Sequence, residues 1–230
     1  MRERAIGGSA LAAAAVLLWA AAACSGGGDG DDDGATGVVV SSSTAPPTTA
    51  EPPPCSESRY AVVFDINGTI TASIQELPNW LNDPSYEPKP RELAPELARA
   101  YQERGYELWY VTALPGSHMI GDQPATEALT EWLGDNGFPM AGARVELSET
   151  PNPATELSND LLSAVAEGVT LRAAYTDKPD DVRSFQVAGV EEVYLLSDDV
   201  SAASLSTSIP GGDLAGELER VESLPPICTP

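Results

Sequence analysis

The sequence predicts an α/β fold, a doubly wound parallel sheet, for its folded part. Short runs that are almost entirely apolar alternate along the chain with longer segments whose apolar residues recur at helical spacing. Apolar runs of this length are typical of strands buried on both faces of a parallel sheet. Acidic residues follow directly after two of these runs, where such sheets build their binding sites. Alternating strands and helices therefore predict both the architecture and the edge that carries function.

The first predicted strand covers residues 60–64 and runs into the segment 65–69, which reads DINGT. Asp65 lies just past the carboxyl end of this strand, at the edge where α/β sheets bind ligands. Gly68 allows a sharp backbone turn, and Thr69 offers a hydroxyl and an amide to an anion. We expect this segment to form the centre of a site.

The remaining elements follow in alternating order. Residues 72–90 are rich in Pro, Asn, Asp and aromatic side chains and predict a structured loop or a minimal cap, with Trp80, Leu81 and Tyr86 covering core rather than ligand. Helices are recognised by one apolar face and a following glycine, such as Gly105. The predicted helices cover 90–104, 124–136, 154–167, 181–188 and 213–221, and the later strands cover 107–112, 144–147, 169–175 and 192–196.

The formal net charge is −23, from 35 acidic residues against 12 lysines and arginines. Such a surface repels nucleic acid and anionic bilayers, so we expect no nucleic-acid partner. The acidity is typical of an exported protein that stays in solution.

The amino-terminal residues predict export. Arg2 and Arg4 precede an apolar stretch, 10–23, that is too short to span a bilayer, so 1–23 is expected to be a signal peptide. The small residues before Cys24 resemble a bacterial lipobox, which makes Cys24 a candidate lipid anchor. Residues 24–54 are expected to be a disordered tether, and the folded domain covers 55–230. This predicts a lipoprotein on the outer face of the membrane in a bacterial cell envelope; ordinary secretion is the alternative.

Two further cysteines, Cys55 and Cys228, bracket the predicted domain. Because export implies an oxidising compartment, we expect a disulfide between them that joins the two ends of the domain. Two unpaired thiols are the alternative.

Two polar clusters follow predicted strands: Asp65 with Asn67, and Asp177 with Asp181. Mg²⁺ prefers oxygen ligands and usually keeps several waters. Asp65, a later aspartate and a backbone carbonyl would therefore suffice to bind it. Alternatively, Asp177 and Asp181 belong to a polar turn that caps a helix.

Several segments together resemble the lipin-type phosphatidate phosphatase domain of the HAD (haloacid dehalogenase-like) superfamily. They are VVFDINGTIT, YELWYVTALPGS, TEWLGDNGFP, RAAYTDKPDDVRSFQVAGV and VYLL, in that order. The same domain forms the carboxyl-terminal part of multidomain phosphatidylinositol transfer proteins. The resemblance implies a HAD-like fold and a Mg²⁺-dependent phosphatase acting on phosphatidic acid, or an inactive version that binds it.

The resemblance also assigns roles to individual residues. Asp65 matches the nucleophile that forms an aspartyl-phosphate, and the backbone carbonyl of Asn67 matches a metal ligand. Thr112 matches the second-motif hydroxyl at the phosphoryl group, next to Ala113. The implied set has catalytic residues Asp65, Asn67 and Thr112, ligand-binding residues Gly68, Thr69, Ala113 and Lys178, and metal ligands Asp65, Asn67, Asp177 and Asp181.

Three departures from the family pattern weaken the expected catalysis. Asn67 replaces the general acid, and an amide cannot transfer protons near neutral pH. Leu114 replaces an arginine that would bind phosphate, and no lysine lies at 157–160, where the third motif is expected. Lys178 is the candidate to neutralise a phosphate instead. We expect a slow or degenerate phosphohydrolase, a binding module for a phosphorylated ligand or phospholipid headgroup, or a scaffold without a site.

Overall fold

The computed structural model describes residues 54, 59–149, 153–197 and 204–228. The predicted signal peptide, all but the last residue of the predicted tether, and both Cys24 and Cys55 lie outside these residues. Within the described part, no helix combines the length and the apolar character needed to cross a membrane.

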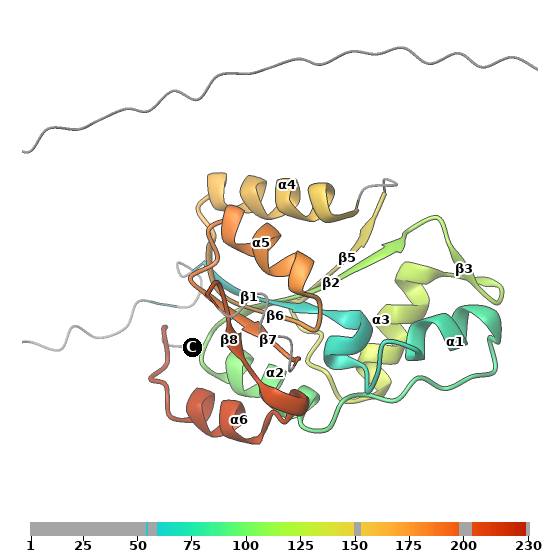
Figure 1. The fold of residues 1–230 in the computed structure, drawn as a ribbon, viewed down its shortest axis with the longest axis horizontal. Coiled ribbons are helices and arrows are strands. Elements are labelled where there is room, and N and C mark those ends of the chain that lie inside the picture. Colours follow the sequence, from blue (N-terminus) through green and yellow to red (C-terminus); the bar gives the residue numbers. More distant parts are fainter. Residues whose placement is uncertain (1–53, 55–58, 150–152, 198–203, 229–230) are drawn as a thin grey trace, which may run out of the picture. The chain divides into compact units, whose positions relative to one another are not determined.

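A six-stranded sheet lies at the centre of the described domain (Figure 1). Its strand order is β5-β2-β1-β6-β7-β8, and every neighbouring pair is parallel. Ala61, Val62, Val63 and Phe64 are buried, which confirms that the apolar run of β1 lies inside the sheet. The strands are β1 (Tyr60–Asp65), β2 (Glu107–Pro115), β5 (Arg144–Ser148), β6 (Thr170–Thr176), β7 (Glu192–Leu195) and β8 (Thr207–Ser208).

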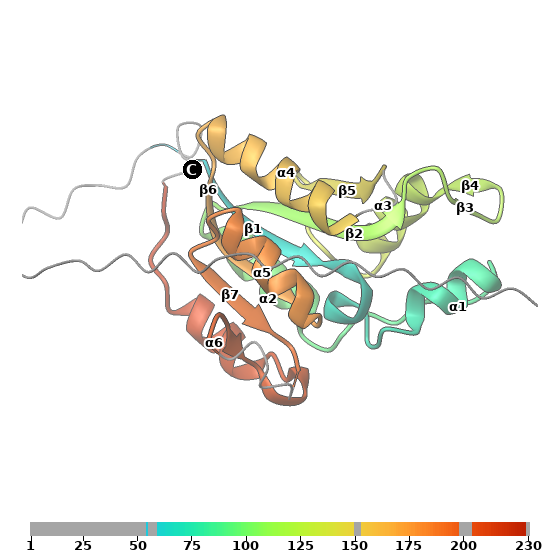
Figure 2. The ribbon, with the colours of Figure 1, turned by 45° about the horizontal axis from the view of Figure 1, so that its top comes forward.

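Helices cover both faces of the sheet, as the doubly wound prediction requires (Figures 1 and 2). One core contains Leu161 and Phe185 from the first face, and the other contains Leu97, Leu133 and Val221 from the second. The helices of the first face are α4 (Pro153–Ala166) and α5 (Pro179–Val187), and those of the second are α2 (Ala94–Glu103), α3 (Ala125–Asp135) and α6 (Ala215–Glu222).

A small cap stands beyond the carboxyl ends of β1 and β2. It consists of α1 (Glu76–Asn82) and the hairpin of β3 (Met119–Ile120) and β4 (Gln123–Pro124), which contact each other. Trp80 and Leu81 pack against Ile120, so both side chains cover core, as expected. The hairpin occupies a segment that the sequence predicts to be loop.

Most element boundaries differ from the predictions by one or two residues, and three differences have a visible structural context. Helix α2 begins at Ala94 rather than at residue 90, because Leu93 takes a left-handed φ of +63°. Strand β2 continues to Pro115, which pairs with Ser148 after a register shift. Helix α5 has Lys178 at its N-cap, so Asp177 precedes the cap and Asp181 lies in the first turn of the helix.

A buried polar cluster joins α2, β6 and α6, and we call Tyr101, Tyr175, Glu217 and Arg220 the tyrosine network. The Tyr101 and Tyr175 hydroxyls lie 2.7 Å apart, and Tyr175 donates to Glu217. Arg220 donates to both Glu217 oxygens, at 2.6 and 2.9 Å, and to the Tyr101 hydroxyl at 3.0 Å. Arg220 Nη1 also lies 3.6 Å from Glu192 Oε2 on β7, so the network ties the last helix to the sheet through an arginine that contacts two carboxylates.

Cys228 is buried next to the carbonyl of Gly105, at the end of the described chain. Its expected partner, Cys55, lies outside the described residues, so the pairing stays a prediction.

Candidate functional site

The chain turns away from the sheet directly after Asp65, through the segment η1 (Ile66–Ile70). Gly68 has a φ of +83°, and a Cβ at this position would lie 2.0 Å from Asp177 Oδ2. The Gly68 amide donates to Thr71 Oγ1 at 2.7 Å. Position 68 therefore requires glycine, both for its backbone conformation and for the close approach of the β6–α5 loop.

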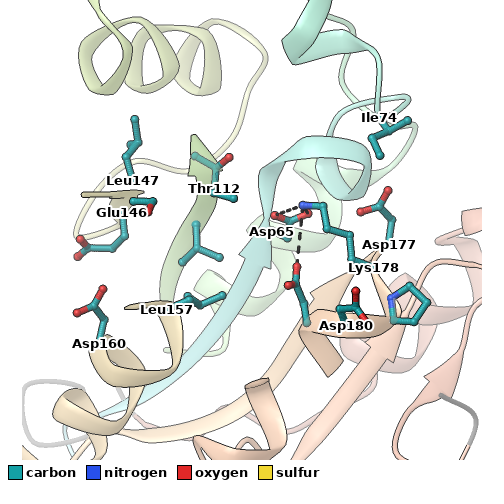
Figure 3. A pocket seen from close by; sticks show the side chains of 15 residues that line it. Asp65, Ile74, Thr112, Glu146, Leu147, Leu157, Asp160, Asp177, Lys178 and Asp180 are labelled. Carbon is teal, nitrogen blue, oxygen red and sulfur yellow. Dashed lines mark hydrogen bonds and ion pairs between the residues drawn. The ribbon is translucent and has the colours of Figure 1, made fainter. Parts of the chain in front are cut away.

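Asp65 forms an ion pair with Lys178, across the edge between β1 and β6 (Figure 3). Lys178 Nζ lies 3.1 Å from each of the two Asp65 oxygens, and 3.9 Å from Asp181 Oδ2. The single ammonium therefore contacts two carboxylates that come from different elements.

Thr69 fixes the orientation of the Asp65 carboxylate. Its hydroxyl donates to Asp65 Oδ2 at 3.0 Å and accepts from the Asp177 amide at 2.9 Å. The side chain expected to offer its hydroxyl to an anion thus links the two polar loops to each other. Its contribution to the site is to hold Asp65.

Burial governs the titration of these acids. It raises the pKa of Asp65 from 3.8 to about 7, against the opposing effect of Lys178. Burial also raises the pKa of both Asp177 and Asp181, again opposed by Lys178. The pKa of Lys178 is itself raised: burial lowers it, but the surrounding carboxylates outweigh burial. The ammonium is therefore charged at neutral pH, while Asp65 is only partly ionised.

A cavity of about 540 Å³ opens in front of Asp65 and Lys178 (Figure 3). Glu146 and Asp160 lie on the side opposite Lys178 and Asp177, and Leu147 beside Glu146 and Leu157 beside Asp160 add apolar lining. Among the fifteen described lining residues, six are acidic and Lys178 is the one basic side chain. An anion alone would be repelled from such a cavity, whereas an anion accompanied by a cation would not.

Two buried oxygens at this edge have no hydrogen-bond partner among the described residues: Asn67 Oδ1 and Asp177 Oδ1. An unpartnered buried acceptor costs about 1–3 kcal/mol, so these atoms are suited to a bound cation. The acids do not, however, converge into a ready three-ligand metal group within the described part. Lys178 lies between Asp65 and Asp181, whose oxygens would be among those that hold a metal.

Of the residues expected in the site, six line the cavity, and the other three lie in the supporting turn. Thr112 is among the lining residues and is buried, and its Oγ1 accepts from the Leu114 amide at 3.3 Å. Leu114 itself packs against the core. The lining set is Asp65, Thr112, Ala113, Asp177, Lys178 and Asp181, and the supporting set is Asn67, Gly68 and Thr69.

Three residues at the site were not predicted from the sequence: Arg91, and the acidic lining residues Glu146 and Asp160. Arg91 donates through Nε to the Thr69 carbonyl at 2.6 Å, and through Nη2 to the Gly68 carbonyl at 2.5 Å. It thereby fixes the turn that carries the site, and nothing in its local sequence indicates this. Glu146, by contrast, lies near the carboxyl end of a predicted strand, so the same rule that singled out Asp65 could have found it.

Comparison with solved structures supports the fold. A putative HAD-like phosphatase from Mesorhizobium loti matches with a TM-score of 0.50 and 16% identity, over 75% of this chain and 89% of that one. The D,D-heptose 1,7-bisphosphate phosphatase from B. bronchiseptica, complexed with magnesium and phosphate, gives 0.49 and 12%, over 71% and 97%. At 16% identity the first likeness concerns the fold alone, and the second, with a TM-score below 0.5, carries no argument.

Comparison with protein families is more specific. No curated protein matches the chain significantly. The model of the LNS2 domain of PITM 1–3 matches residues 62–197, which is more than half of the chain and contains every residue assigned to the candidate phosphate and metal site. The match confirms the lipin-type resemblance, and the chain belongs to the LNS2 family of HAD-like domains.

Proposed function

We propose that the chain is a pseudophosphatase, a module that binds a phosphomonoester group at the carboxyl ends of β1 and β6 without rapid turnover. The observation that carries this proposal is the amide of Asn67, two residues beyond Asp65, in the position of the family's proton-transfer group. General acid–base help typically contributes 10²- to 10⁴-fold to a rate. A site that retains the nucleophile and lacks this group is suited to bind a phosphomonoester and release it before hydrolysis occurs.

Mg²⁺ is the proposed companion of the ligand. Asp65, Asp177 and Asp181 supply oxygen donors, and the unpartnered Asn67 Oδ1 and Asp177 Oδ1 fit the same chemistry. When bound, the ion would supply positive charge that neutralises a phosphoryl group. Thr69 would keep Asp65 oriented, and Lys178 would add the site's own positive charge.

A slow phosphomonoester hydrolase is the second candidate function. It is favoured by Asp65, which remains at the strand end over the cavity. Burial raises the pKa of Asp65 to about 7, which lowers the ionised fraction at neutral pH, and the fraction that stays ionised is nucleophilic.

Binding and turnover measured side by side would separate the two functions. Isothermal titration with phenyl phosphate and Mg²⁺ reports binding, and hydrolysis of p-nitrophenyl phosphate reports turnover. The proposal expects Mg²⁺-dependent binding in the wild type, its loss in Asp65→Ala, and no hydrolysis above that of Asp65→Asn. Hydrolysis well above that variant would favour the slow enzyme, and absence of phenyl phosphate binding would contradict the proposal.

Binding to lipid vesicles distinguishes a lipid headgroup from a soluble phosphomonoester as the ligand. Vesicles of phosphatidylcholine with phosphatidic acid present a phosphomonoester, while vesicles with phosphatidylglycerol present a phosphodiester. Binding to the first alone would identify a lipid headgroup as ligand. Binding of phenyl phosphate without binding to either vesicle would identify a soluble ligand.

The Asn67→Asp variant tests whether one missing group limits catalysis. If the rest of the site is competent, p-nitrophenyl phosphate hydrolysis should rise by roughly 10²-fold or more. An unchanged rate would place the limit elsewhere, for which Leu114 and the lysine absent from 157–160 are the candidates.

We also propose that the mature chain is anchored at the outer face of a bacterial membrane through Cys24, with secretion as the alternative. The lipobox-like residues before Cys24 support this. Metabolic labelling with a palmitate analogue should mark the wild type and leave Cys24→Ser unlabelled. Equal labelling of both would contradict the anchor.

A further inference from the structure

We infer that Lys178 is a built-in counter-ion of the site, which a divalent cation must displace from Asp65 and which then becomes the positive group that holds the phosphomonoester. The inference rests on the proposed function, because it assigns to one side chain the coupling between cation and ligand. It starts from geometry: Nζ lies 3.1 Å from both Asp65 oxygens, so the ammonium takes up the edge of the carboxylate that a metal would use.

The two partners of this ion pair differ in their freedom to move. The Asp65 side chain is 4% exposed, and Thr69 holds its Oδ2 at 3.0 Å. The Lys178 side chain is 29% exposed and is a flexible four-carbon stem. Asp65 is therefore the fixed partner, and Lys178 is the one that can leave.

The backbone of Lys178 need not move when its side chain does. Its amide donates to Thr176 Oγ1 at 3.0 Å, and the residue stands at the N-cap of α5. Pro179 follows and starts the helix with a fixed φ. Rotation about the side-chain bonds is sufficient to take the ammonium from Asp65 into the adjoining cavity, which Lys178 already lines.

A cation and the ammonium cannot share Asp65 without strong repulsion. Asp65 Oδ1 accepts from Lys178, and Oδ2 accepts from both Lys178 and Thr69. A divalent ion at either oxygen would face the ammonium at contact distance, in a buried place where charge interactions are weakly screened. Uptake of the ion and departure of Lys178 are therefore one coupled event.

The departure of Lys178 has a second effect, because the cavity has no other basic lining residue in the described part. While Lys178 is paired with Asp65 and lies near Asp181, its charge is neutralised within the site. Once released, it is available to an anion. Cation and phosphomonoester should therefore bind with positive cooperativity, each raising the affinity of the other by the same factor.

Calorimetric titration of Mg²⁺ into the full chain, with and without inorganic phosphate, tests this coupling. Without phosphate, Lys178→Gln should bind Mg²⁺ at least about tenfold more tightly than the wild type, because the competing charge is gone. Lys178→Arg keeps the charge and should stay near the wild type. Lys89→Gln removes the sequence's other lysine at an exposed position and serves as the matched control, with little change.

Phosphate completes the test. It should raise the Mg²⁺ affinity of the wild type and of Lys89→Gln by a larger factor than that of Lys178→Gln, in which only the direct attraction between Mg²⁺ and phosphate remains. Equal or weaker Mg²⁺ binding by folded Lys178→Gln, with folding checked by circular dichroism, would overturn the inference. If Lys178→Gln gains Mg²⁺ affinity but phosphate binds none of the proteins, the competition stands and the proposed function fails.

Discussion

The two polar clusters of this domain are built from similar residues and are put to different uses. In the tyrosine network, both oxygens of the buried Glu217 accept hydrogen bonds, and Arg220 contacts Glu192 as well as Glu217. At the site, Asp65 and Asp181 share one lysine, and Asp177 Oδ1 has no hydrogen-bond partner among the described residues. A cluster whose buried carboxylate has a partner at each oxygen fixes a structure. A cluster with surplus negative charge, open to a cavity, supports the proposed binding of a cation.

The largest expected effect on the free energy of unfolding comes from Asp65, in the candidate site. Asp65 has a pKa raised to about 7 by burial, so the folded protein binds a proton there that the unfolded chain has already lost above its ordinary value of 3.8. The free energy of unfolding should therefore fall as pH rises between these two values. Asp65→Asn removes this penalty and should stabilise the protein at about pH 8 by roughly 4 kcal/mol.

Urea unfolding at a series of pH values measures this difference. It should vanish near pH 4 and grow up to about pH 7. Asp83→Asn removes an exposed carboxylate whose pKa is lowered by hydrogen bonds from Ser85, and it should show no such gain. A pH-independent difference for Asp65→Asn would mean that Lys178 keeps Asp65 ionised throughout.

The next largest effect is expected in the tyrosine network. Arg220→Met leaves Glu217, which is buried, without its ion-pair partner. Unpairing a buried charge costs 3–5 kcal/mol, and we expect about 3 kcal/mol because Arg220 itself is one third exposed. Urea unfolding at neutral pH gives the value. The double variant Arg220→Met with Glu217→Met should recover part of it, and a single-variant loss below about 1 kcal/mol would show that the network is dispensable.

A smaller effect on the free energy of unfolding is expected at Gly68, where the backbone lies close to the Asp177 carboxylate. Gly68→Ala combines a left-handed φ with a collision against the Asp177 carboxylate, whereas Gly168→Ala has a similar φ of +92° and open space. The first should lose about 2 kcal/mol more than the second, the range of an overpacked contact. Equal losses would mean that Asp177 moves aside at no cost.

The smallest effect concerns an exposed ion pair. Arg172 contacts Glu191 at 2.6 Å and Glu192 at 2.7 Å, with about a third of its side chain exposed. Arg172→Gln should change the free energy of unfolding by less than about 1 kcal/mol, and less still in high salt. A larger loss would place this pair with the tyrosine network rather than with the surface.

The strands and helices of this chain could be predicted because they depend on local pattern. The run from Ala61 to Phe64 is apolar at every position, and a parallel sheet buries both of its faces. Helix starts were less predictable: α2 begins only after Leu93, which has a left-handed φ, and the side chain of nearby Arg91 holds the turn at Gly68. That contact joins residues 23 positions apart, so no local pattern encodes it.

The candidate site was predicted as a set of residues but not as an arrangement. Asp65 and Lys178 lie 113 positions apart, and the sequence suggested that Lys178 would face a phosphate rather than Asp65. Thr69 was expected to offer its hydroxyl to an anion, and it links Asp65 to the Asp177 backbone instead. Pairing among charged side chains depends on which loops meet, and periodicity does not report that.

Arg91 also reaches the carbonyl of Gly212, at 3.4 Å, in the segment η3 (Pro210–Gly212). The family match ends at residue 197, yet Gly212, Glu217 and Arg220 all lie beyond it. The folding unit is thus longer than the stretch by which kinship is recognised. A protein cut at residue 197 would lose the contact between Arg91 and Gly212, which supports the turn at Gly68. It would also lose Glu217 and Arg220, two of the four residues of the tyrosine network.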